Sequence, residues 1–177
     1  MPFSFTVPLE PQTASRPNWT AAGRSTRTFM PKRYREWREG FNDWLIDWLS
    51  DTDSQLFYFL THLQDGEWVR ERGEDGALGP VSEHFYGYAF ELTFVLPRTA
   101  HELRVFPIAT RTADIDNYTK ALTDGIFESE PAKHYGINDR WIQDLHSIKR
   151  YTWYGSEEKP HIEVVIKRIE EVDGLYT

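Results

Sequence analysis

The chain has 177 residues, 40% of them hydrophobic and 15% aromatic, and a formal net charge of −8. This composition suits one compact domain with a substantial core and argues against disorder. The chain has no cysteine, which excludes disulfides, thiolate metal sites and cysteine nucleophiles. Its start lacks a basic region followed by a long apolar run, so we expect no signal peptide and no membrane span.

Hydrophobic patterning predicts the first elements. Residues 3–7 alternate between apolar and polar and predict a strand, whereas residues 12–29 are polar and basic and predict a loop. Residues 31–50 predict an amphipathic helix, because large apolar side chains recur at three- and four-residue spacing after Pro31. These side chains are Tyr34, Trp37, Phe41, Trp44, Leu45, Trp48 and Leu49. We expect the three tryptophans to pack in the core.

Residues 51–84 predict an acidic insertion. Their apolar residues allow one short helix over residues 56–63, after which glycines and Pro80 interrupt the pattern. The segment holds eight acidic and two basic residues, a net charge of −6, so we do not expect it to attract a polyanion. Residues 11–38 have the opposite bias, with seven basic residues and one acidic residue.

The second half alternates strands with one helix. Alternation over residues 86–96 predicts a strand, and residues 115–127 predict a helix that buries the side bearing Leu122. The other expected elements are a short edge strand over 104–109, a loop over 128–140, and strands over 144–154 and 161–169. Together these elements predict an α/β (α+β) fold, in which a small mixed β-sheet is packed by two main helices within one domain spanning 1–177.

Acidic residues gather around the start of the second predicted helix. Asp116, Lys120 and Asp124 are four residues apart and therefore share one helix face. Asp114 precedes this helix, close to its free N–H groups, and Asp139 lies in the loop before a strand. Crowded carboxylates repel one another unless a cation or proton intervenes, and Mg²⁺ binds one or two carboxylates together with phosphate. The pattern therefore predicts metal-assisted phosphate chemistry.

Simpler interpretations of the same residues stay open. Asp114 or Asp116 could be an ordinary N-cap, and Lys120 could form surface ion pairs one helical turn away. The D-x-D pattern also occurs in phosphatases of the haloacid-dehalogenase type, but these have Thr or Val where this chain has Tyr118. Glycosyltransferases with D-x-D bind a nucleotide diphosphate through Mn²⁺ in larger domains.

In order, these residues resemble the motif of one nuclease family. Residues 114–126, DIDNYTKALTDGI, are similar to the D-x-D-N-x-x-K-x-x-x-D core of the RusA family of Holliday-junction resolvases. Further along, that family has an acidic pair, then Ser-Gln-Ile/Val, a strand and a lysine. Here residues 138–142, NDRWI, and Lys149 stand in those places, and Asn138 replaces the first acid. The resemblance covers about residues 1–50 and 86–168.

The resemblance implies a homodimeric crossover junction endodeoxyribonuclease, of a kind that many phages and prophages encode. Such enzymes require Mg²⁺, for which Mn²⁺ can substitute, and resolve four-way DNA junctions by paired symmetric nicks in recombination and repair. Asp114, Asp116 and Asp139 would be catalytic metal ligands, Lys120 the catalytic lysine, and Asp124 and Asn138 their supporting neighbours. Residues with a weaker claim, to DNA binding, are Arg16, Arg24, Arg27, Lys32, Arg33, Lys149 and Arg150.

Two questions stay open at this point. The chain could instead be a non-catalytic DNA- or protein-binding relative of the fold. The insertion at 51–84, which compact family members lack, could shape a dimer, gate the site or contact a partner. The expected location is the cytoplasm of a bacterial or phage-infected cell.

Overall fold

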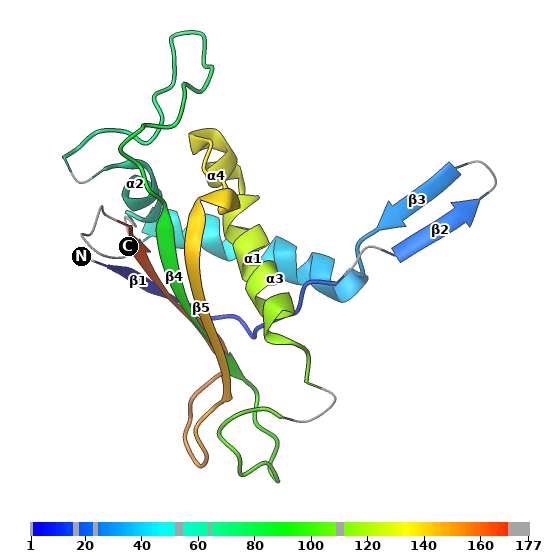
Figure 1. Ribbon diagram of the computed structural model, residues 1–177. Helices are drawn as coiled ribbons and strands as arrows, with labels where there is room; N and C mark the ends of the chain where they lie inside the picture. Colours follow the sequence, from blue (N-terminus) through cyan, green and yellow to red (C-terminus); the bar gives the residue numbers. More distant parts are fainter. Residues whose placement is uncertain are drawn as a thin grey trace, which may run out of the picture.

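A computed structural model describes residues 2–15, 18–22, 25–51, 55–63, 65–108 and 112–169, with backbone alone over 18–22 and 25–29. It contains six strands, four α-helices and one 3-10 helix within these ranges (Figure 1). In chain order they are β1 Phe3–Val7, β2 Asn18–Ala22, β3 Ser25–Phe29, α1 Lys32–Asp51, α2 Leu56–Thr61, β4 Tyr88–Leu96, α3 Ile115–Phe127, α4 Glu130–Tyr135, η1 Asp139–Trp141, β5 Ile142–Tyr151 and β6 His161–Arg168. Arg16 and Arg24 lie outside the described residues.

Four strands form one mixed sheet in the order β1-β6-β4-β5. β6 pairs antiparallel with both β1 and β4, whereas β4 and β5 pair in parallel. A parallel pair needs a crossover connection, and α3 lies within the one that joins β4 to β5. The expected small α+β fold with a mixed sheet is therefore confirmed, and β5 lies at an edge of the sheet.

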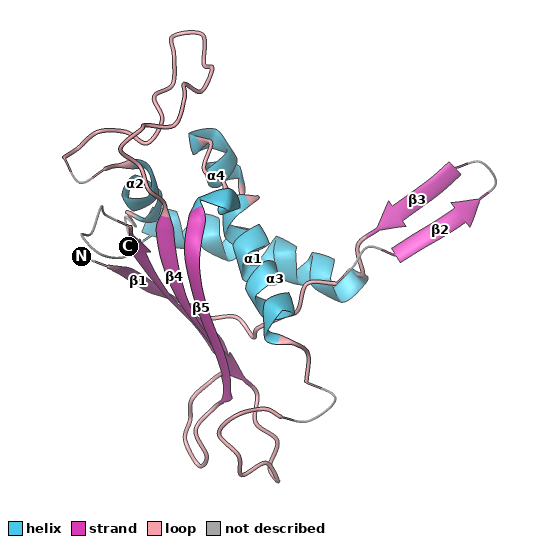
Figure 2. Ribbon diagram, in the orientation of Figure 1, coloured by secondary structure: helices cyan, strands magenta, loops and turns pink. Residues whose placement is uncertain are grey.

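Alternation along the strands produces a sheet with one buried face. Phe90, Leu92 and Phe94 of β4 are buried together with three residues of β6, which are Ile162, Val164 and Ile166. α1 and α3 lie on the same side of this sheet (Figure 2), and Phe41 and Leu122 belong to the same core. Burial of this apolar surface is the main stabilising contribution to the fold.

Close packing of the two main helices depends on Gly125. A Cβ atom at this position would lie 3.0 Å from the ring of Phe41, so a side chain here would push α1 away from α3.

The tryptophans of α1 lie half-buried against the core as expected, and Trp48 stacks on Phe5 with 5.0 Å between ring centroids. The helices predicted over 31–50 and 115–127 are thus confirmed within one residue.

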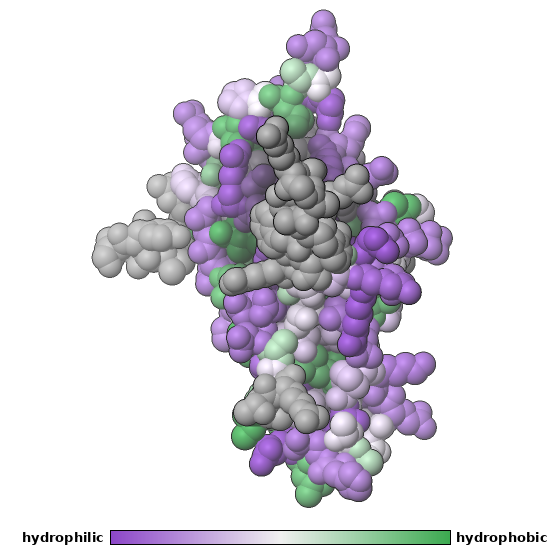
Figure 3. Space-filling model, turned by 90° about the vertical axis from the view of Figure 1, so that its right-hand side faces the viewer, coloured by the Kyte–Doolittle hydropathy of each residue, from purple (hydrophilic) through white to green (hydrophobic). Residues whose placement is uncertain are grey.

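The loop expected over 12–29 is wrong, because β2 and β3 form an antiparallel hairpin there. The segment contains Thr20, Thr26 and Thr28, and β-branched residues favour strands even in a polar stretch. The hairpin extends away from the sheet and helices (Figure 1). Figure 3 views the molecule from that side, where the described side chains are mostly hydrophilic.

Residues 128–140 are not wholly a loop either. Ser129 caps α4, because its Oγ accepts a hydrogen bond from Ala132 N at 3.3 Å. Gly136 then ends this helix in the left-handed conformation, with φ 64°, which glycine adopts without a steric penalty. The edge strand expected over 104–109 is absent from the described residues 104–108, where Pro107 has no N–H to donate.

The acidic segment contributes to the common core. The short helix expected there is confirmed as α2, and Leu56, Phe57 and Leu60 of this helix are buried together with Val69. None of the helices described in the structure has the length and apolarity needed to cross a membrane.

Candidate active site

A cavity of about 520 Å³ lies between α3 and the edge strand β5. It contains four of the residues that the sequence pattern singled out. The lining residues are Ile115, Asp116, Thr119, Lys120, Thr123, Asp124, Asp139, Leu145 and Ser147. The polar residues of α3 and the distant Asp139 are therefore brought together by the fold.

The amphipathic character of α3 explains this arrangement. Leu122 and Ile126 are buried in the core, which turns Asp116, Lys120 and Asp124 toward the cavity, one helical turn apart. Asp139 arrives from the other end of the connection, because α4 and η1 return the chain to the start of β5.

Lys120 and Asp124 form an ion pair inside this cavity. Lys120 Nζ lies 3.1 Å from Asp124 Oδ1, and the lysine side chain is 65% exposed whereas that of the aspartate is 13% exposed. The hydrogen bond to Asp124 raises the pKa of Lys120 above its usual 10.5. The cavity therefore presents an ammonium group that stays charged at neutral pH.

Tyr34 of α1 contacts the second carboxylate oxygen of Asp124 in this pair. Its hydroxyl donates to Asp124 Oδ2 at 3.4 Å, and burial raises the pKa of this tyrosine. Asp124 thus accepts one bond from a buried phenol and another from the exposed ammonium of Lys120. This arrangement makes Asp124 a residue that positions Lys120.

Two further contacts attach β5 to α3. Thr119 Oγ1 on α3 donates to Ser147 Oγ on β5 at 3.0 Å. Lys149 Nζ donates to the backbone carbonyl of Ala113 at 2.6 Å, just before α3 begins. Sequence analysis missed Tyr34, Thr119 and Ser147, because their roles depend on contacts between segments and no local pattern marks them.

Asp114 and Asn138 are not among the residues that line the cavity. Asp114 is the N-cap residue of α3, yet its side chain makes no capping hydrogen bond and is not among the residues that line the cavity. Asn138 caps η1, because its Oδ1 accepts from Arg140 N at 3.0 Å. One lone pair of this amide oxygen is therefore used in a structural bond.

The residues predicted to bind DNA fall into separate groups. The guanidinium of Arg150, whose side chain is 11% exposed, is paired within the protein, since it donates to Glu158 at 2.8 and 3.0 Å and to Glu163 at 3.3 Å. Lys149 Nζ uses one of its three N–H groups for the bond to Ala113. Lys32 and Arg33 are exposed at the start of α1, with the acidic neighbours Glu36 and Glu10, while Arg27 lies on β3.

The carboxylates of the cavity can hold Mg²⁺ only if phosphate and water supply its other ligands. Among the residues the structure describes, no three Asp, Glu or His side chains come close enough to hold a metal ion. Asp116 and Asp139 nevertheless line the same cavity, and Mg²⁺ often takes one or two carboxylates while phosphate and water complete its coordination. Asp114 would have to move to add a third carboxylate.

Comparison of the chain with known protein families gives no match, and comparison with curated proteins gives none either.

Proposed function

We propose that this protein is a Mg²⁺-dependent, structure-selective DNA endonuclease of the RusA type, which resolves four-way junctions. One observation carries the proposal, namely that Asp116, Lys120, Asp124 and Asp139 all line one cavity. These are four of the residues on which the resemblance rests. Three of them lie on α3, and the fourth, Asp139, lies in η1 beyond α4. An ordinary N-cap or a surface ion pair would not require Asp139 to lie with the residues of α3.

The chain's own residues suit a reaction at phosphate. Lys120 presents a cation whose position is held by Asp124 and, through it, by Tyr34. A positioned cation stabilises the charge that develops on a phosphate in the transition state. The side of the cavity formed by α3 is mostly polar, since Asp116, Thr119, Lys120, Thr123 and Asp124 line it.

Asp116 and Asp139 would hold the metal, with Asp114 as a further ligand if the start of α3 adjusts on binding. When bound, Mg²⁺ would supply Lewis-acid polarisation of the scissile phosphate and favour the ionised form of an attacking water. Hydrolysis would then leave a 5′-phosphate and a 3′-hydroxyl.

A homodimer would match the symmetry of the substrate. A four-way junction requires two opposed cuts, and a two-fold dimer presents two equivalent sites. Lys32 and Arg33, exposed at the start of α1, are suited to hold phosphate backbone without reading sequence.

The direct test is cleavage of a synthetic four-way junction with Mg²⁺ and, in parallel, with EDTA. We expect paired nicks with Mg²⁺ alone, and Asp116→Asn should reduce the rate by at least about 100-fold. Asp47→Asn is the matched control, since Asp47 is exposed on α1 and distant in sequence from the site. If Asp116→Asn cleaves as fast as the parent protein, the proposal fails.

A non-catalytic, DNA-binding role is the second candidate. It is favoured by the separation of the carboxylates, since no three of them gather among the described residues, and by Asn138 in place of an acid. Junction binding without nicking, together with no binding of divalent ions in a titration, would establish it. Release of phosphate from small esters would instead indicate a phosphatase.

A further inference from the structure

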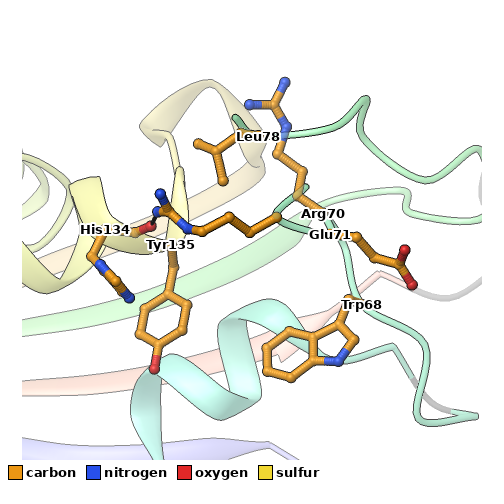
Figure 4. Close-up of a pocket in the computed structure, with 7 residues that line it drawn as sticks. Trp68, Arg70, Glu71, Leu78, His134 and Tyr135 are labelled. Carbon is orange, nitrogen blue, oxygen red and sulfur yellow. Dashed lines mark hydrogen bonds between the residues drawn. The ribbon is translucent and has the colours of Figure 1, made fainter. Parts of the chain in front are cut away.

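A second cavity, of about 380 Å³, lies between the acidic segment and the end of α4 (Figure 4). It shares no lining residue with the candidate active site. Its principal lining residues are Trp68, Arg70, Arg72, Leu78, His134 and Tyr135. Residues from two segments far apart in sequence thus form one hollow.

Positive charge is concentrated at this cavity. Residues 51–84 have a net charge of −6 and contain two basic residues, and both of these, Arg70 and Arg72, line the cavity. Glu71 lines it too, but Figure 4 shows its carboxylate on the opposite side from His134 and Tyr135. The two arginines therefore make this hollow a cationic site within an acidic segment.

The two arginines differ in how they are held. Arg72 Nη1 donates to the Gly76 carbonyl at 2.8 Å, and its Nη2 donates to the carbonyl of His134, so this guanidinium is fixed in place. Arg70 Nε is buried and has no hydrogen-bond partner in the described structure. A ligand in the cavity would therefore meet Arg70 at its terminal Nη groups, because Nε itself is buried.

The remaining walls are aromatic. Trp68 and Tyr135 stand on either side of the hollow (Figure 4) and are 41% and 39% exposed. Trp68 packs on His62, with 3.8 Å between centroids, and Tyr135 stacks on Phe57 at 6.1 Å. Each ring is thus supported from one side and has surface left for a planar group.

We propose that this cavity binds one nucleotide unit, with its phosphate at Arg70 and Arg72 and its base against Trp68 and Tyr135. Guanidinium groups bind phosphate through charge-assisted hydrogen bonds, and aromatic side chains stack on any base. A volume of about 380 Å³ is within the range of small-ligand pockets. The unit belongs either to a free nucleotide or to an unstacked nucleotide in a single strand, and this inference does not depend on nuclease activity.

Calorimetric titration of the full chain with deoxyadenosine monophosphate tests the proposal. We expect saturable binding with a Kd of about 1 mM or tighter. Deoxyadenosine and inorganic phosphate, each titrated alone, should bind at least about tenfold more weakly, because each satisfies one half of the site. Binding of inorganic phosphate as tight as that of the nucleotide would overturn the role of the aromatic walls.

Variants locate the binding. Arg70→Gln and Trp68→Leu should each weaken nucleotide binding by about tenfold, and Arg104→Gln, at an exposed arginine outside the cavity, should leave it unchanged. Thermal unfolding identifies any variant that fails to fold, and Tyr135→Leu replaces Trp68→Leu in that case. Unaltered binding by Arg70→Gln, or no saturable binding by the parent chain to any probe, would refute the proposal.

A short single-stranded oligodeoxyadenylate distinguishes the two sources. If it binds at least about tenfold more tightly than the monophosphate and loses this advantage in Arg70→Gln, the site takes a nucleotide of a strand. If the monophosphate binds more tightly than the strand, the site takes the free nucleotide. Either result supports the cavity as the binding site.

Discussion

Lys149 on β5 donates a hydrogen bond from its Nζ to the backbone carbonyl of Ala113, over 2.6 Å. The bond ties the edge strand to the chain immediately before α3, and therefore holds the end of the helix from which Asp116 projects. A residue that sequence analysis placed at the DNA backbone thus has a structural partner within the protein.

Replacement of Lys149 by Met should lower the free energy of unfolding by about 1 kcal/mol, because the carbonyl of Ala113 loses a charged donor. Urea denaturation measures this change. Lys159→Met, at an exposed lysine, should change stability by less than about 0.5 kcal/mol. If Lys149 acted through DNA alone, both variants would unfold alike and only junction affinity would fall.

The pKa of Lys120 should be above 10.5 in the parent protein and should fall when Asp124 is replaced by Asn, because the bond to Asp124 is the main cause of its elevation. Because folding raises this pKa, the ion pair stabilises the folded protein at pH values below the pKa of Lys120 in the unfolded chain. This stabilisation is lost as the pH rises through the pKa of Lys120 in the folded protein. NMR titration of the lysine side chains follows this change directly. A pKa of Lys120 that is the same in Asp124→Asn would contradict the pairing.

Tyr34→Phe removes only the hydroxyl that donates to Asp124 Oδ2. We expect junction cleavage to slow by about threefold, since Asp124 is held less firmly and Lys120 is positioned less well, with a stability loss of about 1 kcal/mol or less. Cleavage rates under single-turnover conditions report the effect. Tyr154→Phe, at an exposed tyrosine, is the matched control, and equal rates in the two variants would exclude a positioning role for Tyr34.

Arg150→Met should destabilise the protein by about 2 kcal/mol at neutral pH, because it removes the guanidinium that pairs with Glu158 in a partly buried pair, while Trp153 N still donates to this carboxylate. The bond to Arg150 lowers the pKa of Glu158 below its usual 4.5. The contribution of the pair is therefore present above pH 4.5 and is lost as pH falls through the folded-state pKa. Urea denaturation at neutral and at acidic pH should show that the difference in unfolding free energy between Arg150→Met and the parent protein becomes smaller in acid. A difference that does not change with pH would contradict the pairing.

The elements with strong local periodicity could be predicted from the sequence. α1 and α3 appear within one residue of their expected bounds, because side chains three and four positions apart share a helix face whatever lies around them. α4 was missed although its Ser129 cap and Gly136 terminus are both visible in the sequence, since six residues are too few for a periodic signal. The hairpin of β2 and β3 was missed because polarity outweighed the strand preference of its threonines.

Within the candidate site, the shared face of Asp116, Lys120 and Asp124 follows from sequence spacing alone. Its completion by Asp139 and Ser147 depends on the parallel pairing of β4 with β5, which brings distant segments beside α3. The partners of Lys149 and Arg150 also depend on the tertiary structure. These adjacent residues point to opposite faces of a strand and bond to different segments, Lys149 to Ala113 and Arg150 to Glu158. Local pattern thus determined the long helices and the polar face of α3. The order and register of the strands decided which residues meet, because contacts between segments have no periodic signature.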